Sequence, residues 1–108
     1  MVAGISGQPI YAVADGKVIK SVAYHNGNNY YSYGECIIIE HGKDSKGNLI
    51  YTLYAHGSPG TRMVSTGDMV TQGQTIMKVG TTGNSTGAHL HFEVLVNGSP
   101  TNPVPYLP

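Results

Sequence analysis

The sequence has little charge. Only 11% of its 108 residues are Asp, Glu, Lys or Arg, against about 25% in an average domain. Six basic and six acidic residues give a formal net charge of zero at pH 7, and the basic residues are spread along the chain. A surface that binds nucleic acid or anionic lipid requires a concentration of positive charge. The composition therefore predicts no nucleic-acid partner.

Cysteine and long apolar runs are also scarce. Cys36 is the one cysteine, so it forms no disulfide within the chain and no multi-cysteine zinc site. Its neighbours in Cys36–Ile39 indicate a small buried hydrophobic residue. The longest hydrophobic run, Ile10–Ala14, is far shorter than the roughly 18 to 20 residues that span a bilayer, so we expect no membrane span. Residues Met1–Gly4 lack the pattern of a signal peptide.

Glycine and proline are abundant. The 15 Gly and 6 Pro are spaced so that no stretch free of both exceeds ten residues, whereas an average helix has about 11 to 12. The segments between them are rich in Val, Ile, Thr and Tyr, which is typical of strands. The sequence therefore predicts one all-β domain over residues 1–108. We expect strands at Pro9–Ala14, Lys17–Tyr24, Glu35–Glu40, Leu49–His56, Thr75–Val79 and His89–Val96.

The connecting segments carry further predictions. The polar run Lys43–Asn48 predicts the turn of a hairpin between the third and fourth strands. The stretch His25–Tyr33 predicts a second loop, whose tyrosines offer either a binding surface or half-buried packing. Four prolines from residue 100 onward predict an extended tail over residues 99–108. An exposed sheet edge near Gln8–Ala14 predicts self-association of the chain.

Histidine is the feature with most chemical content, with five copies in the chain. In the strand His89–Val96, a period of two places Leu90, Phe92, Val94 and Val96 on the core face, and His89, His91 and Glu93 on the other. Two imidazoles on one face lie roughly 6.5 to 7 Å apart along the strand. Both reach one metal site, or one binds a metal while its neighbour handles a proton.

The other three histidines also allow interpretations without a chemical role. His56 ends the strand that begins at Leu49, and it is either a strand-end residue without a chemical role or part of a site. His41 precedes Gly42, which favours a histidine satisfied by hydrogen bonds near a turn. His25, beside Asn26, is interpreted as a surface residue.

The segment Gly80–Val94, GTTGNSTGAHLHFEV, resembles the closing signature of the lysostaphin-type zinc endopeptidases. Upstream pieces resemble the family in the same order, so that the likeness runs from about Gly7 to Val96; they are Pro9–Val18, Ile38–Gly42, Tyr51–His56 and Val64–Gly80. The resemblance implies a small antiparallel half-barrel structure with a groove. It also implies hydrolysis of peptide bonds in bacterial cell-wall peptidoglycan, outside the cytoplasm.

Residue by residue, the resemblance makes His91 a metal ligand and makes His89 and His56 the catalytic histidines. One zinc ion is the implied cofactor, with three protein ligands and a water in the fourth position. The family's other two ligands lie in a His-x-x-x-Asp motif, whose Asp would fall at about Met1, and the sequence lacks this motif. We therefore expect weak or absent zinc binding and impaired activity in the chain as written.

Two explanations of this departure stay open. The chain is a truncated piece of an active peptidase, or it is a non-catalytic relative that binds the cell wall or regulates another wall hydrolase. Retention of His56, His89 and His91 favours the first.

Overall fold

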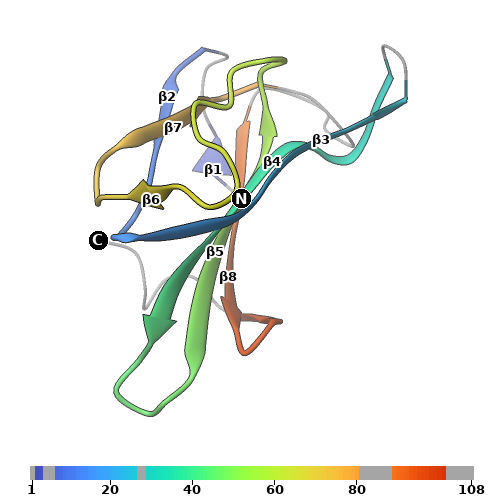
Figure 1. Ribbon diagram of the computed structural model, residues 1–108. Helices are drawn as coiled ribbons and strands as arrows, with labels where there is room; N and C mark the ends of the chain where they lie inside the picture. Colours follow the sequence, from blue (N-terminus) through green and yellow to red (C-terminus); the bar gives the residue numbers. More distant parts are fainter. Residues whose placement is uncertain (1, 4–6, 27–28, 81–88, 102–108) are drawn as a thin grey trace.

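The computed structural model describes residues 2–3, 7–26, 29–80 and 89–101, with side chains described for residues 7–24, 33–80 and 92–98. Figure 1 shows these residues as strands joined by turns and loops. Within the described ranges there is no helix, and hence none long and apolar enough to cross a membrane.

All the strand pairings are antiparallel. The strands are β1 (Val2–Ala3), β2 (Pro9–Tyr11), β3 (Gly16–Asn26), β4 (Asn29–Lys43), β5 (Leu49–Gly57), β6 (Met69–Val70), β7 (Thr75–Lys78), β8 (His89–Val96) and β9 (Ser99–Thr101). The larger sheet has the order β1-β8-β5-β4-β3-β6, with β9 also paired to β8, and β2 pairs with β7 in a second sheet. The predicted all-β class is confirmed.

The loop predicted at His25–Tyr33 is largely wrong. Strand β3 continues to Asn26 and β4 begins at Asn29, so the two form one long hairpin arm, with His25 opposite Tyr30. The strand propensity of the tyrosines outweighs the asparagines that suggested a loop. The hairpin turn predicted at Lys43–Asn48, by contrast, is confirmed.

The extended tail predicted from residue 99 is also wrong at its start. Ser99–Thr101 form β9, in which Pro100 lies opposite Leu95 of β8. Proline has no N–H to donate, and it is tolerated where a strand lies at the edge of a sheet. The rest of the predicted tail, residues 102–108, lies outside the described residues.

Two clusters of apolar residues pack on opposite faces of the larger sheet. The main core joins this sheet to the β2–β7 pair, seen in the upper left of Figure 1; it includes Ile37, Ile39, Tyr54, Phe92 and Val94 from the larger sheet, with Ile10, Ile76 and Met77 from the smaller. Phe92 and Val94 are thus buried as predicted. The other cluster, here called the second face, consists of Val22, Tyr24, Tyr33, Cys36, Ile38, Leu53 and Ala55. Cys36 is fully buried there, as predicted.

The β2–β7 pair also bears on the predicted sheet edge at Gln8–Ala14. The chain from Gly7 to Ala12 runs beside β7, with hydrogen bonds from Gly7 N to Val79 O and from Ala12 N to Gln74 O. Strand β2 ends at Tyr11, three residues earlier than predicted, and its pairing register shifts between Ile10 and Tyr11. Self-association through this region stays a prediction.

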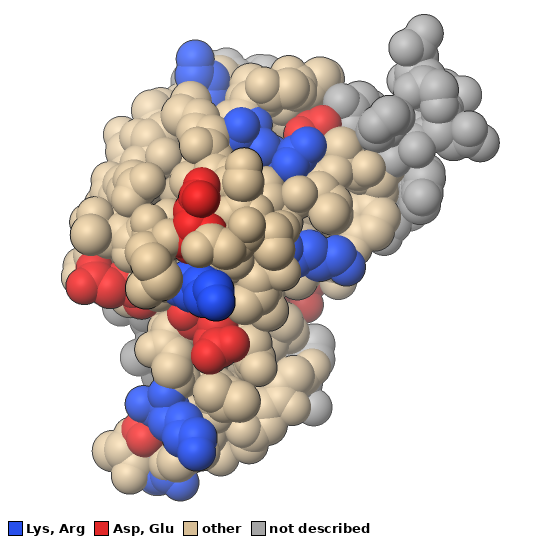
Figure 2. All heavy atoms as spheres, in the orientation of Figure 1, with Lys and Arg blue, Asp and Glu red and all other residues tan. Residues whose placement is uncertain are grey.

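Charges of both signs are interspersed on the face in Figure 2. Both signs also occur on the lobe formed by the β4–β5 turn, whose sequence contains Lys43, Asp44 and Lys46. The view shows no extended surface of one sign.

Candidate functional site

The backbone brings the three histidine positions of the family resemblance to one end of the β5–β8 ladder. His91 on β8 lies opposite Ala55 on β5, and the next residue of β5 is His56. His89, at the start of β8, lies opposite Ala3 of β1. The side chains of His89 and His91 lie outside the described part of the chain, so their roles remain predictions.

His56 occupies an unusual backbone position. Its side chain is buried, with 5% of its surface exposed, and its φ of +60° lies in the left-handed region. That conformation costs a residue with a Cβ atom about 1 to 2 kcal/mol, so the surrounding structure must hold it. The next residue, Gly57, lies against Met77, where an added Cβ would overlap the Met77 Sδ and Cγ atoms, and Gly57 also bridges to Val79.

A row of three aromatic side chains crosses the second face and ends at His56. The Tyr33 ring lies 6.3 Å from the His56 ring, centroid to centroid, with a tilt of 53°. On its other side the Tyr33 ring lies 6.4 Å from Tyr24 with a tilt of 58°. Tilted pairs at these separations are favourable for aromatic rings. Lys20 Nζ lies 5.2 Å from the centroid of Tyr24, within cation–π range.

Tyr33 is anchored at its other end to strand β8. Its hydroxyl donates a hydrogen bond to Glu93 Oε2 at 2.9 Å, and Glu93 lies opposite Leu53 in the ladder. Burial, and secondly this hydrogen bond, raise the pKa of the Tyr33 hydroxyl. The hydroxyl therefore keeps its proton at neutral pH and remains a donor.

A partly buried ion pair joins the segment that follows His56 to strand β4. Arg62 Nε donates to Glu35 Oε1 at 2.7 Å, and Arg62 Nη1 donates to Ser21 Oγ at 2.9 Å. Glu35 is 2% exposed, and it lies opposite Gly57 in the β4–β5 ladder. The pair therefore ties the segment after His56 to strands β3 and β4. Sequence analysis missed it, because Glu35 looked like an ordinary acid flanking an apolar strand.

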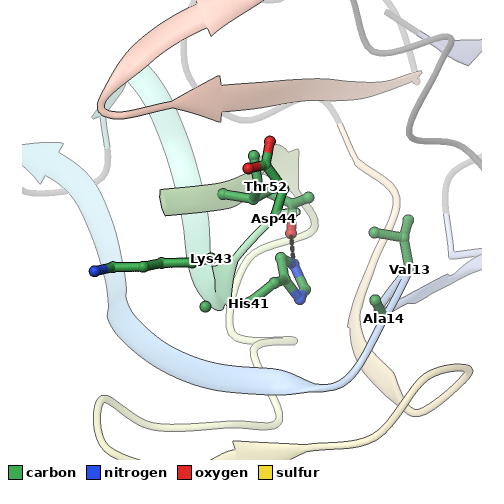
Figure 3. A pocket seen from close by; sticks show the side chains of 8 residues that line it. Val13, Ala14, His41, Lys43, Asp44 and Thr52 are labelled. Atoms are coloured by element: carbon green, nitrogen blue, oxygen red, sulfur yellow. Dashed lines mark hydrogen bonds between the residues drawn. The ribbon is translucent and has the colours of Figure 1, made fainter. Parts of the chain in front are cut away.

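His41 lies near the turn of the β4–β5 hairpin, at the opposite end from His56, beside a hollow of about 170 Å³ (Figure 3). Its Nδ1 donates to Asp15 O at 2.7 Å, and its Nε2 lies 2.7 Å from Thr52 Oγ1. Thr52 Oγ1 is hydrogen-bonded to the Tyr54 hydroxyl at 2.8 Å, which also accepts from Val13 N at 3.1 Å. The prediction of a satisfied histidine near a turn is confirmed for His41.

Of the clustered tyrosines at residues 30, 31 and 33, the structure describes the side chain of Tyr33. Tyr33 is partly buried in the second face, which supports the packing interpretation for that residue. The side chains of His25, Tyr30 and Tyr31 lie outside the described set.

The described side chains do not fit a zinc ion. No three His, Cys, Asp or Glu among them gather closely enough to hold a metal. Burial raises the pKa of the Cys36 thiol to about 12, so it is no thiolate ligand at neutral pH. Both ring nitrogens of His41 are hydrogen-bonded.

Known proteins with similar sequences include a peptidoglycan endopeptidase and a murein hydrolase activator. The peptidoglycan DD-endopeptidase ShyC of Vibrio cholerae is 45% identical over 97 residues, which are 90% of this chain and 19% of that protein. The murein hydrolase activator NlpD of Escherichia coli is 39% identical over 107 residues, which are 99% of this chain and 25% of that protein. The chain thus spans a fifth to a quarter of the length of these relatives.

Solved structures confirm the lysostaphin-type fold. The catalytic domain of lysostaphin from Staphylococcus simulans superposes with a TM-score of 0.77 at 30% identity, over 96% of this chain and 73% of that one. A zinc-containing peptidase from Vibrio cholerae gives 0.73 at 36% identity, over 91% and 26%. Peptidases of this family are zinc-dependent. The sequence model of peptidase family M23 matches residues 1–103, and the chain belongs to that family.

Proposed function

We propose that residues 1–108 form one M23 domain that hydrolyses peptide bonds in bacterial peptidoglycan, outside the cytoplasm. The observation that carries this proposal is the register of β5 and β8, in which His91 lies opposite the residue that precedes His56. Two strands thus bring His56, His89 and His91 to one end of the ladder. ShyC, a peptidoglycan endopeptidase, is similar over 90% of the chain.

In this proposal His56 and His89 are catalytic and His91 is a metal ligand. A neutral imidazole accepts a proton from an attacking water, and an imidazolium returns it to the leaving amine. Such proton transfer contributes about 10²- to 10⁴-fold to the rate. The buried, packed environment of His56 suits a group that must keep one orientation. Zinc dependence belongs to the proposal. Because His91 is the one ligand of the family's three that this sequence supplies, the proposal includes weak zinc binding and impaired activity.

A second candidate function is regulation of another cell-wall hydrolase without catalysis. NlpD of Escherichia coli, a murein hydrolase activator, is similar over 99% of the chain. Under this alternative the domain binds the wall or a wall hydrolase, and the three histidines have no role in cleavage.

The test combines zinc analysis with digestion of purified peptidoglycan. Bound zinc per chain is measured by elemental mass spectrometry. Released peptides are identified by their new amino and carboxyl termini. The catalytic proposal predicts cleavage that a chelator abolishes and that His56→Asn lowers by about 100-fold or more. Normal cleavage by the variant contradicts the assignment of His56.

The regulatory alternative predicts a different pattern in the same assay. The chain then sediments with peptidoglycan or accelerates a second hydrolase, and it releases no peptides by itself. His56→Asn leaves both of these properties unchanged.

A further inference from the structure

Tyr33 is a single side chain that reaches both strands of the proposed site. It lies near the start of the described part of β4, its ring contacts His56 of β5, and its hydroxyl donates to Glu93 of β8. The register places Glu93 opposite Leu53, on the face of the sheet that carries the second cluster. Tyr33 therefore spans β5 and links its functional end to the neighbouring strand.

The Tyr33 ring is itself held from several sides. Tyr24 packs on it at 6.4 Å, and Lys20 lies over Tyr24. Cys36 and its neighbours in the second face pack beneath this row. A ring with packed neighbours and a hydrogen-bonded hydroxyl has few accessible rotamers, so it offers a fixed surface to the imidazole beside it.

The position of His56 makes such a support necessary. The residue follows the last core position of β5, in a left-handed backbone conformation, and its side chain turns into a buried environment. A proton-transfer group must keep its ring nitrogen aligned with the reacting atoms, because a misplacement of about 1 Å costs about 100-fold in rate. The main chain alone leaves the two side-chain torsions of the histidine undetermined.

We propose that Tyr33 is a positioning residue for His56. Its ring fixes the orientation of the imidazole, and its hydrogen bond to Glu93 fixes the Tyr33 ring relative to β8. This inference rests on the proposed catalytic role of His56. It assigns Tyr33 no contact with substrate and no proton transfer.

The experiment compares Tyr33→Phe, Tyr33→Leu and a matched control, Tyr51→Leu. Tyr51 is also a partly exposed tyrosine, and it lies toward the opposite end of β5, opposite Leu95. The first readout is the Cε1–Hε1 NMR signal of His56, recorded without metal or substrate and assigned by its loss in His56→Asn. The second readout is kcat and KM for peptidoglycan cleavage, and thermal unfolding accompanies both.

We expect one narrow His56 signal in the parent chain and in Tyr51→Leu. The signal broadens or splits in Tyr33→Leu, and to a smaller degree in Tyr33→Phe, which keeps the ring and loses the hydroxyl. In an active chain, kcat falls about 100-fold in Tyr33→Leu and about 10-fold in Tyr33→Phe, while KM stays within about twofold. Tyr33→Phe retains the packing, so it keeps the test informative if Tyr33→Leu does not fold.

A His56 signal in Tyr33→Leu as narrow as that of the parent chain overturns the inference. Equal broadening in Tyr51→Leu also overturns it, because the effect is then a general loss of stability. If the parent chain cleaves nothing but the signal broadens only in the Tyr33 variants, the proposed function fails while Tyr33 still positions His56.

Discussion

The chain contains two His-Gly pairs near strand ends, and the structure treats them in opposite ways. His41 is followed by Gly42, which has a φ of +86° and open space around its Cα. His56 has the positive φ itself, and the following Gly57 is packed against Met77. In the first pair the glycine has the positive φ and open space beside it, whereas in the second pair the histidine has the positive φ and the glycine is closely packed.

The surroundings of the two histidines also differ. His41 uses both ring nitrogens in neutral hydrogen bonds to Asp15 O and Thr52 Oγ1, which connect it to the core. His56 is buried, its ring lies 6.3 Å from the Tyr33 ring, and the segment after it is held by the Arg62–Glu35 ion pair. The two hydrogen bonds of His41 fit a residue with a structural role. The comparison teaches that His-Gly in the sequence does not distinguish such a residue from a candidate catalytic one.

The largest expected effect comes from exchanging each histidine for asparagine, which tolerates a left-handed backbone. His56→Asn should lower kcat by about 100-fold or more. His41→Asn should lower the free energy of unfolding by about 1 to 2 kcal/mol, because it breaks one exposed and one partly buried hydrogen bond, and should leave kcat within about twofold. Peptide release from peptidoglycan and urea unfolding measure the two effects.

This crossed pattern is the sharpest test of the comparison. If His41→Asn lowers kcat as much as His56→Asn, the two ends are functionally coupled and the division between them is wrong. If both variants lose only stability, His56 is a second structural histidine.

The next largest effect compares the ion pair near His56 with the neutral hydrogen bond beside His41. Arg62→Ala should lower the free energy of unfolding by about 3 kcal/mol, since it leaves the Glu35 charge buried without this cation. Thr52→Val, which removes a neutral hydrogen-bonding group beside His41, should cost about 1 kcal/mol. Urea unfolding of both variants under identical conditions gives the two values.

Arg62→Lys is the matched control. It keeps the charge but lacks the planar group that donates to both Glu35 and Ser21, so it should recover part of the loss. A cost below about 0.5 kcal/mol for Arg62→Ala would make this pair equivalent to an exposed surface ion pair.

Much of the fold was predictable from local pattern. Five of the six expected strands occur within three residues of their predicted limits, because alternation of apolar residues and breakers is a local signal. The strand predicted at Glu35–Glu40 is longer, since β4 begins at Asn29. Strands β1, β6 and β9 were missed. Each has two or three residues, and tertiary pairing rather than local sequence makes them strands. The His25–Tyr33 loop failed because composition was weighed above strand propensity.

The site was predictable only in part. Resemblance pointed to His56, His89 and His91, and the strand register places these positions together, although their roles stay predictions. The Tyr33 contact with His56 was not predictable, since the residues are far apart in sequence and a register shift separates Glu35 from Ile37 on the paired strand. The burial of Glu35 depends equally on Arg62, which lies in a loop without a recognisable pattern.

Alanine at the two glycines probes their different surroundings. Gly57→Ala should lower the free energy of unfolding by about 1 to 3 kcal/mol, because the new methyl group overlaps the buried Met77 side chain. Gly42→Ala meets no atom within 4 Å, so it should cost about 1 kcal/mol from its positive φ alone. Thermal unfolding measures both. The comparison is further sharpened by Gly57→Ala/Met77→Ala, where the smaller side chain should relieve the overlap.

The smallest effect lies at the β4–β5 turn, beyond His41. Hydrogen bonds from the backbone N–H groups of Asn48 and Lys46 lower the pKa of the Asp44 carboxyl. A lowered folded-state pKa stabilises the protein above the unfolded-state pKa of about 3.9, and this contribution is lost as pH falls through the folded value. Urea unfolding should therefore give the parent chain a larger free energy of unfolding than Asp44→Asn at pH 6. This difference should shrink as the pH falls below the folded-state pKa of Asp44. The Tyr33 and His56 NMR signals should be identical in parent and variant at pH 6, because this turn lies at the opposite end of β5 from His56. A change in those signals would show that the two ends of the hairpin are coupled.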